Sequence, residues 1–166
     1  MELWDAYDRK GALTGVDLIR GEKIPEGLFH LVVEVIVVHT DGTYLLMQRD
    51  YSKPNCPGLY EPGAGGSAVK GEEPAAAAVR ELFEESGIRA SQEDLKPLYH
   101  AVRDETHAIY FGYLCETSID KNAIILQEGE TIGYKWVSAQ EFKEAFDAPW
   151  FVPFMKPRCA DYLNSI

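Results

Sequence analysis

Three glutamates in the middle of the chain have the spacing of neighbours on one helix face. Glu81, Glu84 and Glu85 fall at positions i, i+3 and i+4, which an α-helix places side by side. Like charges at this spacing destabilise a bare helix, so a compensating partner is expected. Clustered carboxylate oxygens suit Mg²⁺ or Mn²⁺, with the phosphates of a bound molecule completing the coordination shell. Taken alone, the pattern leaves open a solvated acidic face, which is the commoner origin of charge runs.

Glycines frame the segment that carries these glutamates. Residues 63–66 contain three glycines and predict a turn before the helix. Pro74 is tolerated in the first turn of a helix, and the four alanines that follow it have high helix propensity. Gly87 suits the left-handed position just past a helix end. The sequence therefore predicts one amphipathic helix over residues 74–86, between a glycine-rich turn and a glycine stop.

The rest of the chain alternates predicted strands with turn signals. Residues 4–20 predict an N-terminal hairpin, and residues 30–39, dense in β-branched side chains, predict a central strand that is apolar on both faces. Further strands are predicted at residues 44–49, 59–62, 95–103, 108–115 and 131–137. Ser138 with Glu141 forms a capping-box pattern for a helix to about residue 146, and residues 149–163 predict a last helix. This mixture predicts an α/β fold with a mixed sheet covered on both faces.

Composition narrows the class of protein. A length of 166 residues predicts one domain over residues 1–166, of which residues 1–27 form the hairpin and a loop. The net charge of −11 argues against a nucleic-acid polymer as partner, but a bound metal would still allow a small phosphorylated substrate. Three cysteines without a CxxC pair favour a reduced, cytoplasmic environment. Neither a signal peptide nor a membrane-spanning run is expected, and a homodimer stays open.

A longer pattern surrounds the three glutamates. From residue 66 to residue 88 the sequence follows G-x5-E-x7-R-E-U-x-E-E-x-G-U, in which U is aliphatic. The matching residues are Gly66, Glu72, Arg80, Glu81, Leu82, Glu84, Glu85, Gly87 and Ile88. At average amino-acid usage, the seven fixed positions match by chance roughly once in 10⁸ windows, which overturns the solvated-face interpretation. Residues 66–88 resemble the Nudix box, and the chain resembles the Nudix hydrolase family.

The resemblance implies an α/β/α sandwich and a metal-dependent hydrolase. The bond cleaved would be a phosphoanhydride in a nucleoside di- or triphosphate, or in a nucleoside diphosphate derivative. By the family pattern, Glu81, Glu84 and Glu85 hold Mg²⁺ or Mn²⁺, Gly66 lends a backbone carbonyl, and Glu81 serves as an alternative general base. Arg80 would orient the glutamates through charge-assisted hydrogen bonds. Such a reaction asks the protein chiefly to position groups and neutralise charge.

A further carboxylate ligand is expected from a distant loop. Glu130 is the candidate for this role, and Glu128 in the same segment is a second choice. Both belong to a polar connector that leads into the predicted strand at residues 131–137. A solvated turn is the alternative interpretation of these residues.

Short motifs along the chain also resemble the isopentenyl-diphosphate isomerase branch of the superfamily. They are Leu3-Trp4-Asp5, His30-Leu31, Gln48-Arg49, Lys53, Pro57-Gly58, Glu130-Thr131, Tyr134-Lys135-Trp136 and Pro149-Trp150. In that branch Arg49 and Lys53 would contact the substrate diphosphate. The isomerase needs a cysteine just before the box, where this chain has Ala64, and of its metal-binding histidines only His30 is in register. The hydrolase is therefore favoured over an isomerase and over a non-catalytic nucleotide-binding sensor.

The substrate pocket is expected to include both charged and aromatic side chains. Glu34 interrupts the apolar strand at residues 30–39, and an unpaired buried carboxylate is costly. It is therefore expected to face a polar cavity or to hold a partner. Tyr60 is an aromatic candidate for stacking on a base. The full set of pocket candidates is Glu34, Arg49, Lys53, Tyr60, Glu61, Tyr110 and Trp150. None of them specifies the group attached to the diphosphate.

Overall fold

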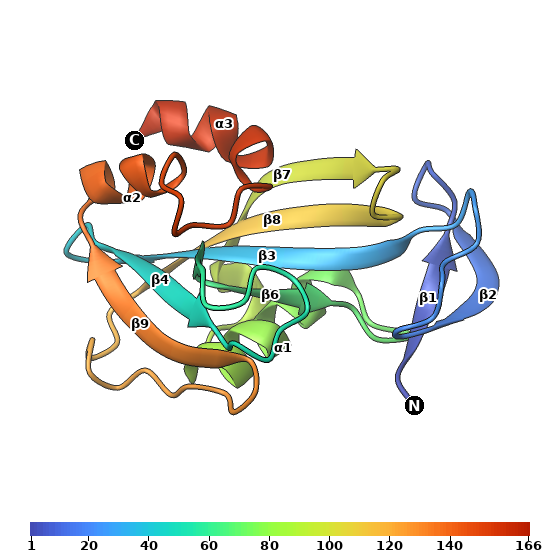
Figure 1. The fold of residues 1–166 in the computed structure, drawn as a ribbon, viewed down its shortest axis with the longest axis horizontal. Helices are drawn as coiled ribbons and strands as arrows, with labels where there is room; N and C mark the ends of the chain where they lie inside the picture. The colour runs from blue at the N-terminus through green and yellow to red at the C-terminus, as the bar shows by residue number, and fades with distance from the viewer.

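Two β-sheets and three α-helices make up the fold (Figure 1). The computed structural model describes residues 1–166. The strands are β1 (Leu3–Tyr7), β2 (Leu13–Ile19), β3 (His30–His39), β4 (Tyr44–Arg49), β5 (Tyr60–Pro62), β6 (Ala64–Ser67), β7 (Leu95–Arg103), β8 (Ala108–Thr117) and β9 (Thr131–Val137). The helices are α1 (Pro74–Ser86), α2 (Ala139–Ala145) and α3 (Lys156–Ser165), with a 3₁₀ turn at Gln92–Asp94.

The larger sheet is mixed and is built around β3. This strand pairs with β8 in parallel over its whole length and with β6 and β4 in antiparallel fashion. The outer strands complete the order β5-β4-β3-β8-β7, and β9 adds to β4. Four of the β-branched residues of β3 fill the core, which explains why this strand lies in the centre of the sheet.

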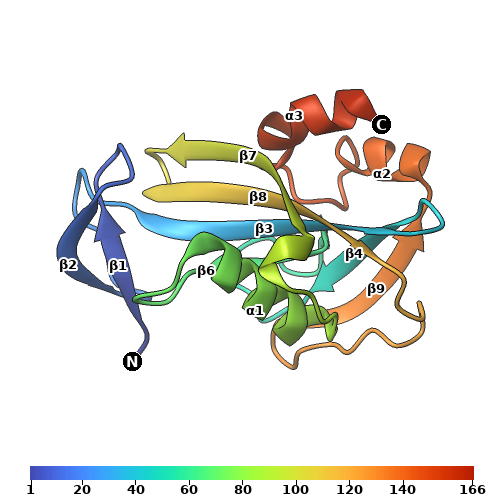
Figure 2. The same ribbon diagram turned by 180° about the vertical axis from the view of Figure 1, so that it is seen from behind.

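The helices cover the two faces of this sheet (Figures 1 and 2). Helix α1 packs its apolar side on one face, in a cluster that includes Ala77, Ala78 and Leu82. Helices α2 and α3 pack on the opposite face, where Phe142 and Cys159 are fully buried. The predicted α/β/α sandwich with a mixed sheet and an N-terminal hairpin is therefore confirmed. No helix is both long and apolar enough to cross a membrane.

The hairpin β1–β2 forms a separate two-stranded sheet at the end of the molecule far from α2 and α3 (Figure 1). Trp4 stacks on His30 of β3, with ring centroids 4.3 Å apart. The backbone N–H of Lys70 donates to Leu3, and that of Gly71 donates to the carboxylate of Asp5, at 2.8 and 2.6 Å. These contacts fix the hairpin to the turn that precedes α1.

Two predicted elements differ from the structure. The glycine-rich segment is not a turn but strand β6, in which Gly65 pairs with Glu34. A Cβ on Gly65 would lie 2.6 Å from the carbonyl oxygen of Val33, so glycine allows a close approach that the sequence pattern could not reveal. The last helix begins at residue 156 rather than at 149, with Pro157 in its first turn. By contrast, the capping box of Ser138 at the start of α2 is confirmed.

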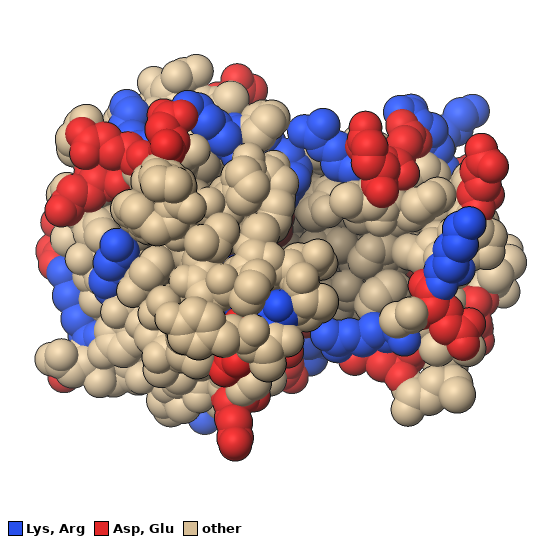
Figure 3. Space-filling model, in the orientation of Figure 1, with Lys and Arg blue, Asp and Glu red and all other residues tan.

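Charged side chains are mixed over the surface shown in Figure 3. Acidic and basic groups alternate around the rim, and uncharged atoms fill the middle of this face. The excess of acidic residues over the whole chain, 27 against 16 basic ones, therefore does not form a single-sign field on this side. Recognition of a charged ligand must come from a local site.

Candidate active site

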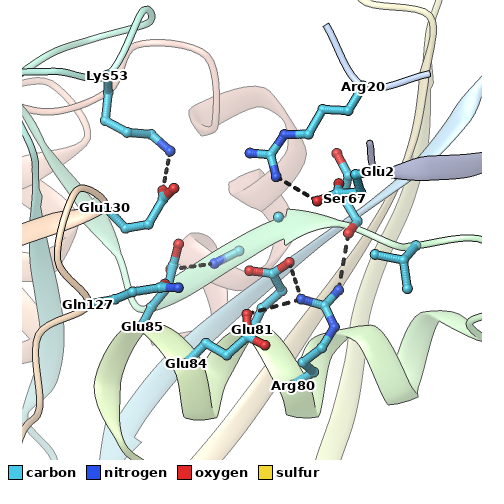
Figure 4. Close-up of a pocket in the computed structure, with 13 residues that line it drawn as sticks. Glu2, Arg20, Lys53, Ser67, Arg80, Glu81, Glu84, Glu85, Gln127 and Glu130 are labelled. Atoms are coloured by element: carbon cyan, nitrogen blue, oxygen red, sulfur yellow. Dashed lines mark hydrogen bonds and ion pairs between the residues drawn. The ribbon is translucent and has the colours of Figure 1, made fainter.

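A polar cavity of about 260 Å³ lies beside α1 (Figure 4). Four parts of the chain meet there: the N-terminal hairpin, the loop after β4, β6 with α1, and the loop before β9. The lining residues are Glu2, Arg20, Lys53, Gly65, Gly66, Ser67, Val69, Arg80, Glu81, Glu84, Glu85, Gln127 and Glu130. Five carboxylates and three cations thus surround a small space, so charge dominates the chemistry of the cavity.

Helix α1 brings the three expected glutamates to this cavity. Its apolar side, with Leu82, is buried in the core, and the 3.6-residue period turns Glu81, Glu84 and Glu85 toward the cavity. Glu85 is only 6% exposed and accepts a hydrogen bond from the backbone N–H of Gly65 at 3.0 Å. No cation pairs with Glu85. Burial and the nearby carboxylates raise its pKa well above the ordinary value.

Arg80 ties the turn before α1 to two of the glutamates. Its Nε and Nη2 donate to both carboxylate oxygens of Glu72, at 2.9 and 2.8 Å. Its Nη1 donates to Glu81 at 2.7 Å and to Glu84 at 3.2 Å. The hydrogen bonds that Arg80 donates to Glu72 are the main cause of its raised pKa. Burial raises the pKa of Glu81, and the charge of Arg80 opposes this shift. Arg80 is therefore placed to hold these carboxylates in position.

Gly66 lies directly against the carboxylate of Glu81. It pairs with Val33 across the β6–β3 ladder, and a Cβ at this position would overlap the carboxylate carbon of Glu81. Any larger residue would displace that carboxylate. Glycine is therefore required here by the space that the acid occupies, in addition to any use of its carbonyl oxygen.

The donor set of the cavity fits a hard divalent cation. Its acidic side chains all offer carboxylate oxygens, which such ions prefer, and Gly66 lines the same cavity. In their present positions no three His, Cys, Asp or Glu side chains are grouped as metal ligands. Arg80 engages Glu81 and Glu84, whereas the buried Glu85 lacks a compensating charge. A cation would supply that charge, so the residues fit Mg²⁺ or Mn²⁺.

The structure also brings Lys53 and Glu130 to the cavity. The two side chains form an ion pair with each other on the wall opposite Arg20 (Figure 4). Glu130 thus lies where a further acidic ligand was expected, beside the glutamates of α1. Glu128, the second choice, is exposed and does not line the cavity.

A second cavity of about 160 Å³ adjoins the first along Gly65 and Gly66. Arg49 lines it and donates to both oxygens of Glu61, at 2.8 and 2.9 Å. Tyr110 also lines this cavity. Together with Glu34, four of the expected pocket residues therefore lie next to the carboxylate site rather than inside it.

Glu34 lines the second cavity and also holds a buried partner. The Nε of Arg158 donates to its carboxylate at 3.0 Å, and Nη2 of the same side chain donates at 2.5 Å. The hydroxyl of Tyr99 donates a third hydrogen bond at 2.6 Å. The costly burial of Glu34 is thus offset by a cation from α3, so Glu34 both faces a polar cavity and holds a partner; the sequence did not identify that partner as Arg158.

The structure does not bring Tyr60 to either cavity. Its ring packs edge-to-face against Trp150 with centroids 5.7 Å apart, and the ammonium of Lys135 lies 4.4 Å from its centroid. Successive residues of a strand point to opposite faces, and Glu61 takes the face that looks into the second cavity. Tyr60 and Trp150 therefore pack together away from both cavities, and their role in substrate binding stays a prediction.

The family-model comparison agrees with this geometry. The model of the NUDIX domain matches residues 28–156 of the chain. The chain belongs to the Nudix family. The members of this family are hydrolases that act on pyrophosphate bonds. The Nudix box at residues 66–88 is the segment that forms β6, the Glu72 turn and α1 in the structure.

Individual relatives extend the likeness over the whole chain. An uncharacterized Nudix hydrolase of Listeria monocytogenes is 30% identical over 154 residues, which is 93% of this chain and 90% of the relative. An isopentenyl-diphosphate Delta-isomerase of Serratia proteamaculans is 28% identical over 145 residues, or 79% and 77% of the two chains. The crystal structure of DR0079 from Deinococcus radiodurans shares the fold, with a TM-score of 0.77, 18% identity and coverage of 99% and 98%.

The likeness to isomerases is confirmed as a weaker one, and Ala64 bears on it. Ala64 opens β6, pairs with Val35 and buries its methyl group. No thiol therefore lies at the position just before the Nudix box. Cys56 lines a different cavity beyond Arg49, and all three cysteines are free.

Several residues of the Nudix cavity lay outside the sequence-based prediction. Glu2 and Arg20 reach it from the hairpin, and Gln127 reaches it from the loop before β9. Arg158, the partner of Glu34, comes from a helix whose start was misplaced. For Arg158 a signal existed, because a buried Glu34 needed a cation. For the other three residues no signal exists in local spacing.

Proposed function

We propose that this Nudix chain is a Mg²⁺- or Mn²⁺-dependent diphosphatase of the cytoplasm. Its substrate is a small phosphorylated molecule: a nucleoside di- or triphosphate, or a nucleoside diphosphate derivative. The observation that carries the proposal is the cluster of five carboxylates in the cavity beside Gly66, among which Glu85 is buried and has no cation as partner. Neither a nucleic-acid polymer nor a membrane is a partner in this proposal. In this proposal one domain over residues 1–166 carries the activity, as a monomer or a homodimer.

The carboxylates of α1 form the metal-binding part of the proposal. Glu81, Glu84 and Glu85 would hold the ion, together with the carbonyl of Gly66 and the carboxylate of Glu130. When bound, such an ion neutralises phosphate charge and activates a water molecule. Arg80 would keep Glu81 and Glu84 oriented through the hydrogen bonds described above.

The substrate-binding part of the proposal rests on two cations, one at the end of β4 and one in the loop that follows it. Lys53 lines the first cavity, where its ammonium can bind a phosphate oxygen as a point charge. Arg49 lines the second cavity, where its fork is held by Glu61 and can contact the remainder of the substrate. Glu34 lies in the same second cavity and would border that remainder from β3.

Proton transfer falls to a carboxylate that is buried but open to the cavity. Glu81 and Glu85 both line the cavity, and carboxylates are suitable proton acceptors in such sites. Either residue can therefore take a proton from water attacking the phosphorus atom. Glutamine at the same position keeps the shape and loses this capacity.

The test is a nucleotide panel with product identification. Purified protein is incubated with Mg²⁺ and nucleoside di- and triphosphates or diphosphate derivatives, and the phosphate-containing products are identified. Glu84→Gln is expected to lose at least tenfold in kcat/KM, and the exposed Glu93→Gln serves as the matched control. Equal rates in the wild type and Glu84→Gln would contradict the proposal. Tight nucleotide binding without hydrolysis would instead identify a sensor.

A further inference from the structure

Arg20 lies outside the segment that matches the Nudix domain model, yet it lines the Nudix cavity. The model covers residues 28–156, whereas Arg20 follows β2 of the N-terminal hairpin. Figure 4 shows its guanidinium reaching over the cavity from the side opposite Lys53, with the carboxylates of α1 below. The hairpin therefore supplies a cation that the core of the fold does not contain.

The hairpin fixes the backbone of Arg20 and the carboxylate of its partner, Glu2. The backbone N–H of Arg20 donates to the carbonyl of Glu2 at 3.1 Å. The indole N–H of Trp4 donates to one carboxylate oxygen of Glu2 at 2.8 Å, and Trp4 is itself stacked on His30. The two residues thus start from an anchored piece of backbone, which lowers the entropic cost of binding a ligand there.

Arg20 differs from the other two cations of the cavity in its free donors. Its Nη1 donates to Glu2 at 3.0 Å, and its Nε and Nη2 have no partner. All three nitrogens of Arg80 are engaged, and the ammonium of Lys53 is paired with Glu130. The Arg20 side chain is 56% exposed, and ion pairs of this kind contribute little stability. An arginine fork with open donors and a weak partner can readily bind a phosphate in two-point fashion.

We propose that Arg20 binds a phosphate of the substrate beyond the diphosphate held over the α1 carboxylates. The substrate class is then one with three or more consecutive phosphates, such as a nucleoside triphosphate. This inference rests on the proposed function. Metal ions at the carboxylates would neutralise two phosphate groups of the substrate, and a third phosphate group then needs a separate cation. Arg20 is the cavity arginine with two donor nitrogens free to meet this need.

The first test measures binding and requires no turnover. Inorganic tripolyphosphate and pyrophosphate are titrated in Mg²⁺ by calorimetry into the wild type, Arg20→Ala, Arg20→Lys and Arg9→Ala. Arg9 is the matched control, because it is an exposed hairpin arginine that pairs with Asp104 outside the cavity. One charge-assisted fork predicts that the wild type binds tripolyphosphate about tenfold more tightly than pyrophosphate. Arg20→Ala is expected to lose that difference, Arg20→Lys to keep part of it, and Arg9→Ala to keep it.

The second test separates this inference from the proposed function. For a nucleoside triphosphate, Arg20→Ala is expected to raise KM about tenfold while kcat changes less than twofold. Equal binding of the two probes by the wild type would overturn the inference, as would an unchanged probe ratio in Arg20→Ala. Equal losses in Arg20→Ala and Arg9→Ala would also overturn it, since only overall charge would then matter. If the probe affinities differ as expected but no turnover is found, the proposed hydrolase function is refuted and the Arg20 inference stands.

Discussion

The ion pair between Glu34 and Arg158 is the most deeply buried in the molecule. Their side chains are 10% and 3% exposed, and the arginine donates through two nitrogens. Replacing Arg158 with methionine keeps much of its volume but leaves the carboxylate with only the Tyr99 hydroxyl. Breaking a buried pair by removing one partner costs about 3–5 kcal/mol, because an uncompensated charge remains in the interior. We expect Arg158→Met to lower the free energy of unfolding by that amount.

The assay is equilibrium unfolding in urea, with a second ion pair as the control. Arg9 and Asp104 also form an arginine–carboxylate pair at 3.0 Å, but their side chains are 65% and 60% exposed. Arg9→Met should therefore cost less than about 1 kcal/mol. The dependence of the unfolding free energy on urea should keep its slope, since the fold and the surface exposed on unfolding do not change.

A double variant tests the reason for the cost. Glu34→Gln with Arg158→Met removes both charges and keeps an acceptor for Tyr99, so the pair of changes should cost clearly less than the sum of the single ones. Two results would refute the reasoning: additive costs in the double variant, or an Arg158→Met cost no greater than that of Arg9→Met.

Three further predictions follow from local structure. Burial lowers the pKa of His30 to about 4. As pH falls, His30 therefore binds a proton in the unfolded protein at a higher pH than in the folded protein. The free energy of unfolding should then drop by up to about 3 kcal/mol between pH 6.5 and 4. When urea unfolding is measured over this pH range, His30→Asn should lose this fall in unfolding free energy, and the exposed His100→Asn should keep it. Identical pH profiles for the two variants would show that His30 is not its source. Ser138→Ala removes the cap of α2 and should cost about 1 kcal/mol in urea unfolding, where an unchanged midpoint would contradict the cap's importance. Gly66→Ala should keep its circular dichroism spectrum but lose at least tenfold in Mg²⁺-dependent hydrolysis, because the new methyl displaces Glu81; full activity would show that the carboxylate has no fixed place.

Much of the fold could be predicted because its signals are local. The apolar run of β3, the capping box at Ser138 and the glycine after α1 each act within a few residues, and each is present in the structure. The parallel pairing of β3 with β8 joins segments about 80 residues apart, and no local pattern states it. Strand β6 was missed because glycine has low strand propensity, whereas here it allows close contact with the Val33 carbonyl.

The site could be predicted in part for the same reason. Glu81, Glu84 and Glu85 meet because one helix carries them, and helix geometry follows from spacing. Arg20 approaches from a separate sheet, and only tertiary packing determines that distance. Sequence spacing could not show that Tyr60 lies outside both cavities, because the face that a short strand turns toward a cavity depends on its pairing register with β4.

Direct binding of Mn²⁺ tests the central claim most closely, namely that the carboxylates of α1 hold a divalent cation. The free ion can be counted by electron paramagnetic resonance in the wild type, in Glu85→Gln and in the exposed control Glu93→Gln. We expect saturable binding in the wild type and the control, and binding at least tenfold weaker in Glu85→Gln, since that variant removes a buried ligand charge. Equal Mn²⁺ affinity in the wild type and Glu85→Gln, or no binding in the wild type, would contradict the account.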